Sequence, residues 1–177
     1  MRRYLSSSID IQPRFCYLVL TGVINVASAV EALHGTYFPG VRDLNIALLA
    51  HDGRKELMVQ FCIAYCGILA AHSVCATNTT GRLVSEATGL PITLYMSCNQ
   101  GGSQQIGSRI AYNELDMVLF FCDPQLVDEY QGSVSELGRL CDQQNIPFAS
   151  NVATAEVLIH GLRRGDLDWR DIVNPKP

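Results

Sequence analysis

The chain is predicted to form an α/β fold in which a parallel sheet is covered by helices on both faces. The first observation is a series of short, continuously apolar runs typical of fully buried strands, at 45–50, 73–76, 92–96, 117–121 and 146–149. The second is a helix-like pattern between these runs and after the last one, at 54–71, 81–88, 103–114, 133–144 and 152–162. Regular alternation of buried strands and helices is typical of a parallel sheet.

The composition narrows the class of protein. A chain of 177 residues is long enough for one domain and an extension, and 48% hydrophobic residues argue against disorder. The net charge of −4 and the lack of a long basic run argue against a nucleic-acid or membrane partner. The seven cysteines have neither CxxC nor Cys/His ligand spacing, so they predict no metal site and no disulfide framework. Free cysteines favour a reducing, cytoplasmic location.

Residues 1–43 form an N-terminal extension to the predicted domain at 44–177. Within it, 17–33 predicts a helix that is apolar nearly all round and is closed by Gly35. Such a helix has to be covered, so we expect it to form an interface in a homo-oligomer. It is too short and too interrupted to anchor the chain in a bilayer. The small residues of Ala27-Ser28-Ala29 leave a second interpretation open, a cleaved signal peptide.

Polar segments follow every predicted strand. They contain a cation, hydroxyls, amides and carboxylates, and they lie at 51–55 (HDGRK), 77–81 (TNTTG), 97–105 (SCNQGGSQQ), 122–124 (CDP) and 150–154 (SNVAT). The carboxyl ends of parallel strands meet at one edge of the sheet, where ligands bind in such folds. We therefore expect the five segments to form one binding site.

The TNTTG segment at 77–81 joins a predicted strand to a predicted helix. Its hydroxyls lie beside the N–H groups that a helix N-terminus leaves without intrahelical partners. The helix dipole favours an anion at that point, most often phosphate. Lys55, one turn into the preceding predicted helix, can supply the counter-charge. The alternative is that Thr79 or Thr80 merely caps the helix.

The order of these motifs resembles the methylglyoxal synthase family. AHDxxK, TxTTG, GGxQQxG, LFFxDP and NIPxAxNxATA follow one another between residues 44 and 159. The resemblance implies a three-layer α/β/α sandwich with a five-stranded, mainly parallel sheet, assembled into a homohexamer. It also implies conversion of dihydroxyacetone phosphate to methylglyoxal and phosphate, without metal or cofactor. The same fold serves as a regulatory domain in carbamoyl phosphate synthetase, so a non-catalytic module that senses phosphate or a sugar phosphate is the alternative.

Matched residue by residue with the family, this chain retains most of the residues of the family's phosphate site. The positions that match the family's phosphate contacts are Lys55, Thr77, Thr79, Thr80, Gly81 and Ser97, while Asn78 replaces a family glycine. His51 and Asp52 match a polar pair after the first strand, and Asp123 matches an aspartate after the fourth. Cys98 stands where the family has a glycine that touches substrate. It is either a reactive thiol near a helix N-terminus or a small buried filler.

The chain departs from the family on the catalytic side of the site. The reaction needs a base that removes a proton next to the carbonyl, so that an enediolate can expel phosphate. Ser103 occupies the position of the family's aspartate base, and Tyr130 and Ser133 occupy those of a histidine and a further aspartate. A serine hydroxyl without a base of its own cannot accept a proton near neutral pH. Asp52 and Asp123 remain as candidate bases, unless they only cap or turn the chain.

Overall fold

The computed structural model describes residues 43–126 and 131–175. The expected N-terminal helix at 17–33 lies outside these ranges, as does Tyr130. Ser133 lies inside them as part of a helix, but its side chain is not described.

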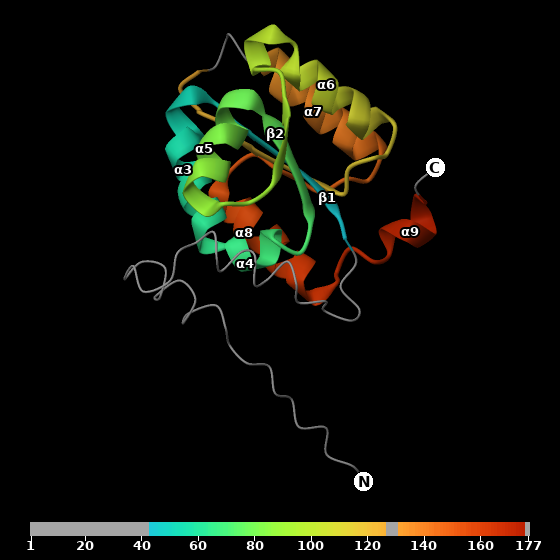
Figure 1. Cartoon of the computed structure of the whole chain (residues 1–177). Coiled ribbons are helices and arrows are strands. Elements are labelled where there is room, and N and C mark those ends of the chain that lie inside the picture. Colours follow the sequence, from blue (N-terminus) through green and yellow to red (C-terminus); the bar gives the residue numbers. More distant parts are fainter. Residues whose placement is uncertain (1–42, 127–130, 176–177) are drawn as a thin grey trace, which may run out of the picture.

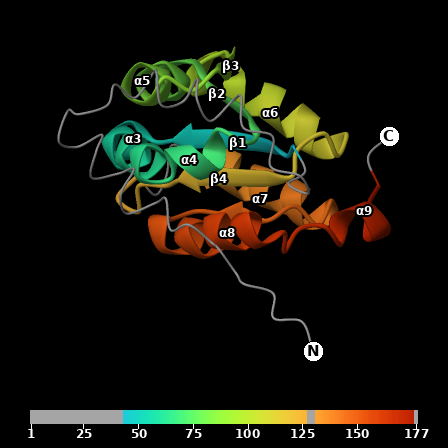
Figure 2. The ribbon, with the colours of Figure 1, turned by 60° about the horizontal axis from the view of Figure 1, so that its bottom comes forward.

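The five strands of the described residues form one sheet in the order β3-β2-β1-β4-β5, and each neighbouring pair is parallel. The strands are β1 (Asn45–Ala50), β2 (Ser73–Thr77), β3 (Ile92–Tyr95), β4 (Met117–Phe121) and β5 (Phe148–Ala149). Figure 2 shows β1 and β4 side by side, with β2 and β3 beyond β1. β5 is shorter than the predicted run 146–149, because the N–H of Ile146 bonds back to Cys141 and Pro147 has no N–H to donate.

The helices follow the predicted order, and several of them begin or end at other residues than expected. They are α3 (Lys55–Ala64), α4 (Cys66–Leu69), α5 (Asn78–Thr88), α6 (Gly102–Ala111), α7 (Gln131–Gln143), α8 (Val152–Arg164) and α9 (Arg170–Val173), with 3-10 turns η1 (Asp52–Arg54) and η2 (Cys98–Gln100). The predicted helix 54–71 is divided at Tyr65, whose φ of −110° and ψ of 18° leave the helical region. α5 begins at Asn78 instead of Gly81, and α9 was not predicted. No described helix is both long and apolar enough to cross a membrane.

The strands send alternate side chains into two hydrophobic clusters, one on each face of the sheet. Ile46, Leu48 and Ala50 of β1 pack with residues of α3, α4, α5 and α8. Ala47 and Leu49 pack with residues of α6 and α7 on the other face. Figure 1 shows α6 and α7 on one side of the strands and α3, α5 and α8 on the other. The predicted three-layer α/β/α arrangement is therefore confirmed.

A buried arginine joins α9 to the amino-terminal end of the sheet, opposite the carboxyl ends of the strands. Arg170 is 2% exposed, and its guanidinium donates to Asp116 Oδ1 (3.0 Å), Asn113 Oδ1 (2.9 Å) and the carbonyl of Asn145 (3.0 Å). Asp116 also accepts the backbone N–H of Asn45 at 2.8 Å, at the start of β1. The network thus connects α9 with the beginnings of β1 and β4.

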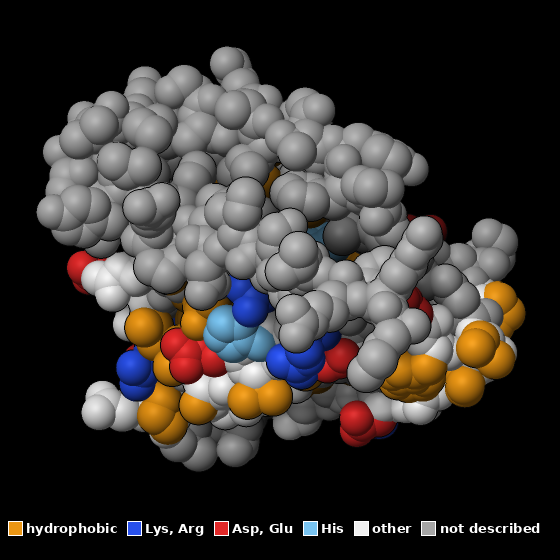
Figure 3. Space-filling view, turned by 90° about the horizontal axis from the view of Figure 1, so that it is seen from below, with side chains coloured by type: hydrophobic (Ala, Val, Ile, Leu, Met, Phe, Trp, Pro, Cys, Tyr) orange, Lys and Arg blue, Asp and Glu red, His pale blue; other side chains and the backbone are white. Residues whose placement is uncertain are grey.

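The apolar side chains of α9 contribute little to holding it in place. Ile172 is 85% and Val173 is 62% exposed, and Trp169, just before the helix, is 44% exposed. Figure 3, seen from below, shows hydrophobic side chains gathered on the side where α9 lies. Because these side chains bury little surface, the polar network around Arg170 is the main attachment of the C-terminal helix.

We expect Arg170→Ala to lower the free energy of unfolding by about 3–5 kcal/mol, because it leaves the carboxylate of Asp116 buried without its cation. Urea unfolding followed by circular dichroism measures the loss. Arg164→Ala is the matched control, since Arg164 forms an exposed pair with Asp166 at 2.6 Å. Its effect should stay within about 1 kcal/mol. Equal losses from the two variants would contradict the role assigned to the buried network.

Candidate functional site

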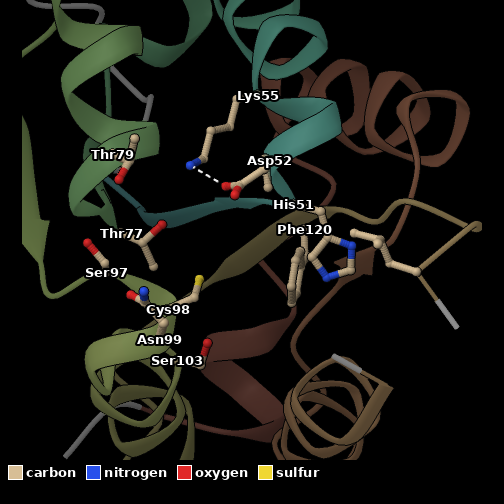
Figure 4. A pocket seen from close by; sticks show the side chains of 12 residues that line it. His51, Asp52, Lys55, Thr77, Thr79, Ser97, Cys98, Asn99, Ser103 and Phe120 are labelled. Carbon is tan, nitrogen blue, oxygen red and sulfur yellow. Dashed lines mark ion pairs between the residues drawn. The ribbon is translucent and has the colours of Figure 1, made fainter. Parts of the chain in front are cut away.

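A cavity of about 210 Å³ opens at the carboxyl ends of the strands. It is lined by Ala50, His51, Asp52, Lys55, Thr77, Thr79, Ser97, Cys98, Asn99, Ser103, Phe120 and Leu126. These residues come from the ends of β1, β2 and β4, from the segments that follow β1, β3 and β4, and from the first turns of α3, α5 and α6. Figure 4 shows their side chains facing a common space.

The structure brings together eight of the residues singled out from the sequence. They are His51, Asp52, Lys55, Thr77, Thr79, Ser97, Cys98 and Ser103. Asn78, Thr80, Gly81 and Asp123 lie near but do not line the cavity. The segment after β5 does not contribute either, because Asn151 uses its side chain to cap α8, accepting the N–H of Thr154 at 3.0 Å. Three of the five expected segments therefore line the cavity, and β4 contributes through Phe120 and Leu126 instead of through 122–124.

Sequence reasoning missed four lining residues, Ala50, Asn99, Phe120 and Leu126. Ala50 and Phe120 belong to predicted strands, and Asn99 lies in the polar SCNQGGSQQ segment, so the strand-end rule pointed to their neighbourhood. Leu126 is an apolar residue after β4, and nothing in its sequence context marks it as part of a site.

The first turn of α5 is open toward the cavity. Its N-cap is Thr77, whose side chain makes no capping hydrogen bond and instead donates to Thr80 Oγ1 at 3.4 Å. Neither Thr79 nor Thr80 caps the helix, so the simple capping interpretation does not explain the threonines. Gly81 has a packing role, because a Cβ there would collide with Leu94 and lie 3.0 Å from the Cβ of Ala76. It lets the helix approach β2 and β3 closely.

The first turn of α6 is open toward the same cavity. Before it, Gly101 adopts a left-handed φ of 97°, and the carbonyl of Ser97 accepts the N–H groups of Gln100 (2.8 Å) and Gly102 (3.0 Å). A Cβ on Gly102 would collide with the carbonyl of Met96, so only glycine fits there. α6 has no side-chain cap and no acidic residue in its first turn. Two helix N-termini therefore point into one cavity.

Lys55 is the only cation among the described residues that line the cavity, and Asp52 is the only carboxylate. The Lys55 ammonium lies 2.5 Å from Asp52 Oδ1. The two side chains differ in exposure, with Lys55 19% and Asp52 90% exposed. Lys55 is therefore directed over the cavity, whereas the carboxylate of Asp52 stays largely in water (Figure 4).

His51 is held as a neutral imidazole beside the cavity. Its Nδ1 accepts the backbone N–H of Asp123 at 2.9 Å, so the proton of the neutral ring is on Nε2. Burial lowers the pKa of His51, although the negative charges of Asp123 and Asp52 oppose this effect. The ring packs edge-on against Phe120, with centroids 5.1 Å apart. A neutral, oriented Nε2–H can donate a hydrogen bond to an oxygen that gains negative charge.

The carboxylate of Asp123 contacts neighbouring turns of the chain and does not line the cavity. Its carboxylate lies 3.5 Å from the guanidinium of Arg54 and accepts the N–H of Gln125 at 3.1 Å. A Cβ on Gly53 would lie only 2.7 Å from Asp123 Oδ2, so the turn after β1 packs directly on this carboxylate. These contacts fit the alternative in which Asp123 shapes the turns after β1 and β4.

The lining chemistry suits a small anion. One cation, several hydroxyls and two open helix N-termini all favour negative charge. The described residues contain no group of three or more His, Cys, Asp or Glu side chains that could hold a metal ion. Cys98 lines the cavity. Cys122, which follows β4 and does not line it, is a poor nucleophile because burial raises the pKa of its thiol to about 11.

Known proteins are similar to this chain in sequence and fold. The family model of the MGS-like domain matches residues 58–150. A methylglyoxal synthase of Caldicellulosiruptor saccharolyticus is 59% identical over 133 residues, which cover 75% of this chain and 94% of that protein. The methylglyoxal synthase of Oceanobacillus iheyensis is 50% identical over 133 residues, which cover 75% of this chain and 95% of that protein. The crystal structure of the methylglyoxal synthase from Elizabethkingia anophelis matches with a TM-score of 0.62 at 38% identity, covering 66% of this chain and 77% of that chain.

Proposed function

The chain belongs to the methylglyoxal synthase family, and we propose on that basis that its cavity binds the phosphate of dihydroxyacetone phosphate or of a related small metabolite. The observation that carries the proposal is that Lys55, Thr77 and Thr79 line one cavity around the N-terminus of α5. A cation, hydroxyl groups and a helix N-terminus each favour phosphate, and here they act on the same space.

The ion pair of Lys55 with Asp52 does not prevent phosphate from binding. The carboxylate of Asp52 is 90% exposed, so water can solvate it when Lys55 turns toward a ligand. Exchange of a solvated carboxylate for a phosphate dianion costs little, because exposed ion pairs contribute at most about 1 kcal/mol. Lys55 can therefore serve as the counter-charge of the ligand.

The other wall of the cavity would receive the carbonyl end of the metabolite. There the neutral His51 can donate from Nε2 to the carbonyl oxygen as that oxygen gains charge. In the family reaction a base removes a proton next to the carbonyl, and the electron pair of the resulting enediolate then expels phosphate. Ser103 lies where the resemblance puts the base, and its hydroxyl cannot take that proton.

We therefore propose that turnover is slow in this chain. The two candidate bases, Asp52 and Asp123, are both engaged in ion pairs. Asp52 is paired with Lys55, whereas Asp123 is paired with Arg54 and does not line the cavity. A non-catalytic module that binds a phosphorylated metabolite is the second candidate. The lack of a second carboxylate among the described lining residues favours it.

Inorganic phosphate should stabilise the protein through Lys55. Phosphate at about 100 times its dissociation constant should raise the free energy of unfolding by about 2.7 kcal/mol. Lys55→Ala should abolish the resulting increase in melting temperature. Arg82→Ala is the matched control, because it removes one positive charge from the exposed side of α5, outside the cavity, and should keep the shift. If phosphate, sulfate and triose phosphates all leave the melting temperature of the wild-type protein unchanged, the proposal is refuted.

Restoring the family's catalytic groups should restore turnover. We expect the variant Ser103→Asp, Tyr130→His and Ser133→Asp to form methylglyoxal from dihydroxyacetone phosphate about 10²–10⁴ times faster than the wild type. Ser103→Asp alone should recover much less, because groups that act as a unit are non-additive. Ser108→Asp, which adds the same charge to α6 outside the cavity, should recover nothing.

Rapid methylglyoxal formation by the wild type would contradict this view of Ser103. Asp52→Asn and Asp123→Asn, measured separately, would then identify the carboxylate that serves as the base. A loss of rate only in Asp52→Asn would point to the carboxylate that lines the cavity.

A further inference from the structure

The phosphate proposed above uses only one of the two helix N-termini that open into the cavity. α6 is 10 residues long, has Gly101 as its N-cap and carries no acidic residue in its first turn. The N–H of Gly102 donates to the carbonyl of Ser97 at 3.0 Å, whereas the N–H groups of Ser103 and Gln104 have no intrahelical acceptor, and the helix dipole makes this end partly positive. α8 shows how the same chain satisfies such an end internally, with the side chain of Asn151. α6 has no such cap.

Ser103 adds a second, independent observation at this helix end. It is the second residue of α6, is only 6% exposed and lines the cavity. Among the described residues, no partner forms a hydrogen bond with its hydroxyl. Figure 4 shows Ser103 on the wall opposite Lys55 and Asp52, with Cys98 and Asn99 beside it. A buried hydroxyl that faces a cavity without a protein partner points to a ligand as its partner.

No carboxylate of the described lining residues lies at the α6 end of the cavity. The only one in the lining, Asp52, is on the wall of Lys55 and is paired with it. Cys98 and Asn99 bring a thiol and an amide, neither of which is an anion. The α6 end therefore offers N–H and O–H donors and a helix dipole, with no negative charge from the described lining to balance them.

We propose that the N-terminus of α6, together with Ser103, binds a carboxylate, so that the preferred ligand is a small phosphorylated carboxylic acid. The inference rests on the proposed phosphate site at α5. Phosphate occupies the Lys55 and α5 end, and the carboxylate accepts hydrogen bonds from the Ser103 hydroxyl and from the N–H groups of Ser103 and Gln104. A triose phosphate presents an uncharged carbonyl at that end and gains less from the dipole.

The test compares two ligands that differ only at the carboxylate. D-3-phosphoglycerate and D-glycerol 3-phosphate (sn-glycerol 1-phosphate) share the phosphate, the three-carbon chain and the configuration at C2, and a carboxylate in one replaces a hydroxymethyl group in the other. Isothermal titration calorimetry on the full chain should give a dissociation constant about tenfold lower for 3-phosphoglycerate. Inorganic phosphate is the third ligand and reports on the phosphate site alone.

Variants of α6 assign the preference to its N-terminus. Ser103→Asp should weaken 3-phosphoglycerate binding at least about tenfold through charge repulsion, and leave glycerol 3-phosphate within about threefold. Ser108→Asp is the matched control, an exposed serine on the same helix outside this cavity, and should keep the preference. If Ser103→Asp does not fold, Ser103→Ala replaces it and should reduce the preference by removing one donor.

The outcomes separate this inference from the proposed function. Equal affinity for the two organic ligands would overturn the carboxylate site, while binding of phosphate and glycerol 3-phosphate would keep the phosphate site. A preference that persists in both Ser103 variants would also overturn it. If none of the three ligands binds, the proposed function itself fails, and this inference fails with it.

Discussion

The parallel pairing of the five described strands is the constraint on which the cavity depends. Because every strand runs in the same direction, each helix that follows a strand begins at the same edge of the sheet. That edge therefore collects the turn after β1, the first turn of α5 after β2 and the first turn of α6 after β3. One reversed strand would move its polar segment to the opposite edge, and the cavity would lose a wall.

The two ends of the sheet serve different purposes. At the amino-terminal end, Arg170 and Asp116 are buried and their polar groups are joined in a hydrogen-bonded network that fixes α9. At the carboxyl-terminal end, α5 and α6 begin without side-chain caps, and Ser103 is buried without a partner among the described residues. Missing caps and a buried hydroxyl without a partner cost stability at the carboxyl-terminal end, and such a cost is typical of a site that binds a ligand.

The sheet could be predicted because its strands are continuous apolar runs, and burial on both faces leaves no other environment for them. The start of α5 could not be predicted, since Asn78, Thr79 and Thr80 are poor helix formers that tertiary packing holds in a first turn. The break at Tyr65 and the attachment of α9 also depend on contacts distant in sequence. Motifs singled out Lys55 and Thr77, which line the cavity, but they did not reveal that Gly81 serves packing.

The central claim is that phosphate binds at the N-terminus of α5, beside Lys55. A titration of the isotopically labelled protein with inorganic phosphate, followed by amide ¹H–¹⁵N correlation spectra, tests it most directly. We predict that the largest saturable shift changes occur at the backbone N–H groups of Thr79 and Thr80, which belong to the first turn of the helix. Changes confined to the far side of the sheet, around Arg170, or none at saturating phosphate, would contradict the claim.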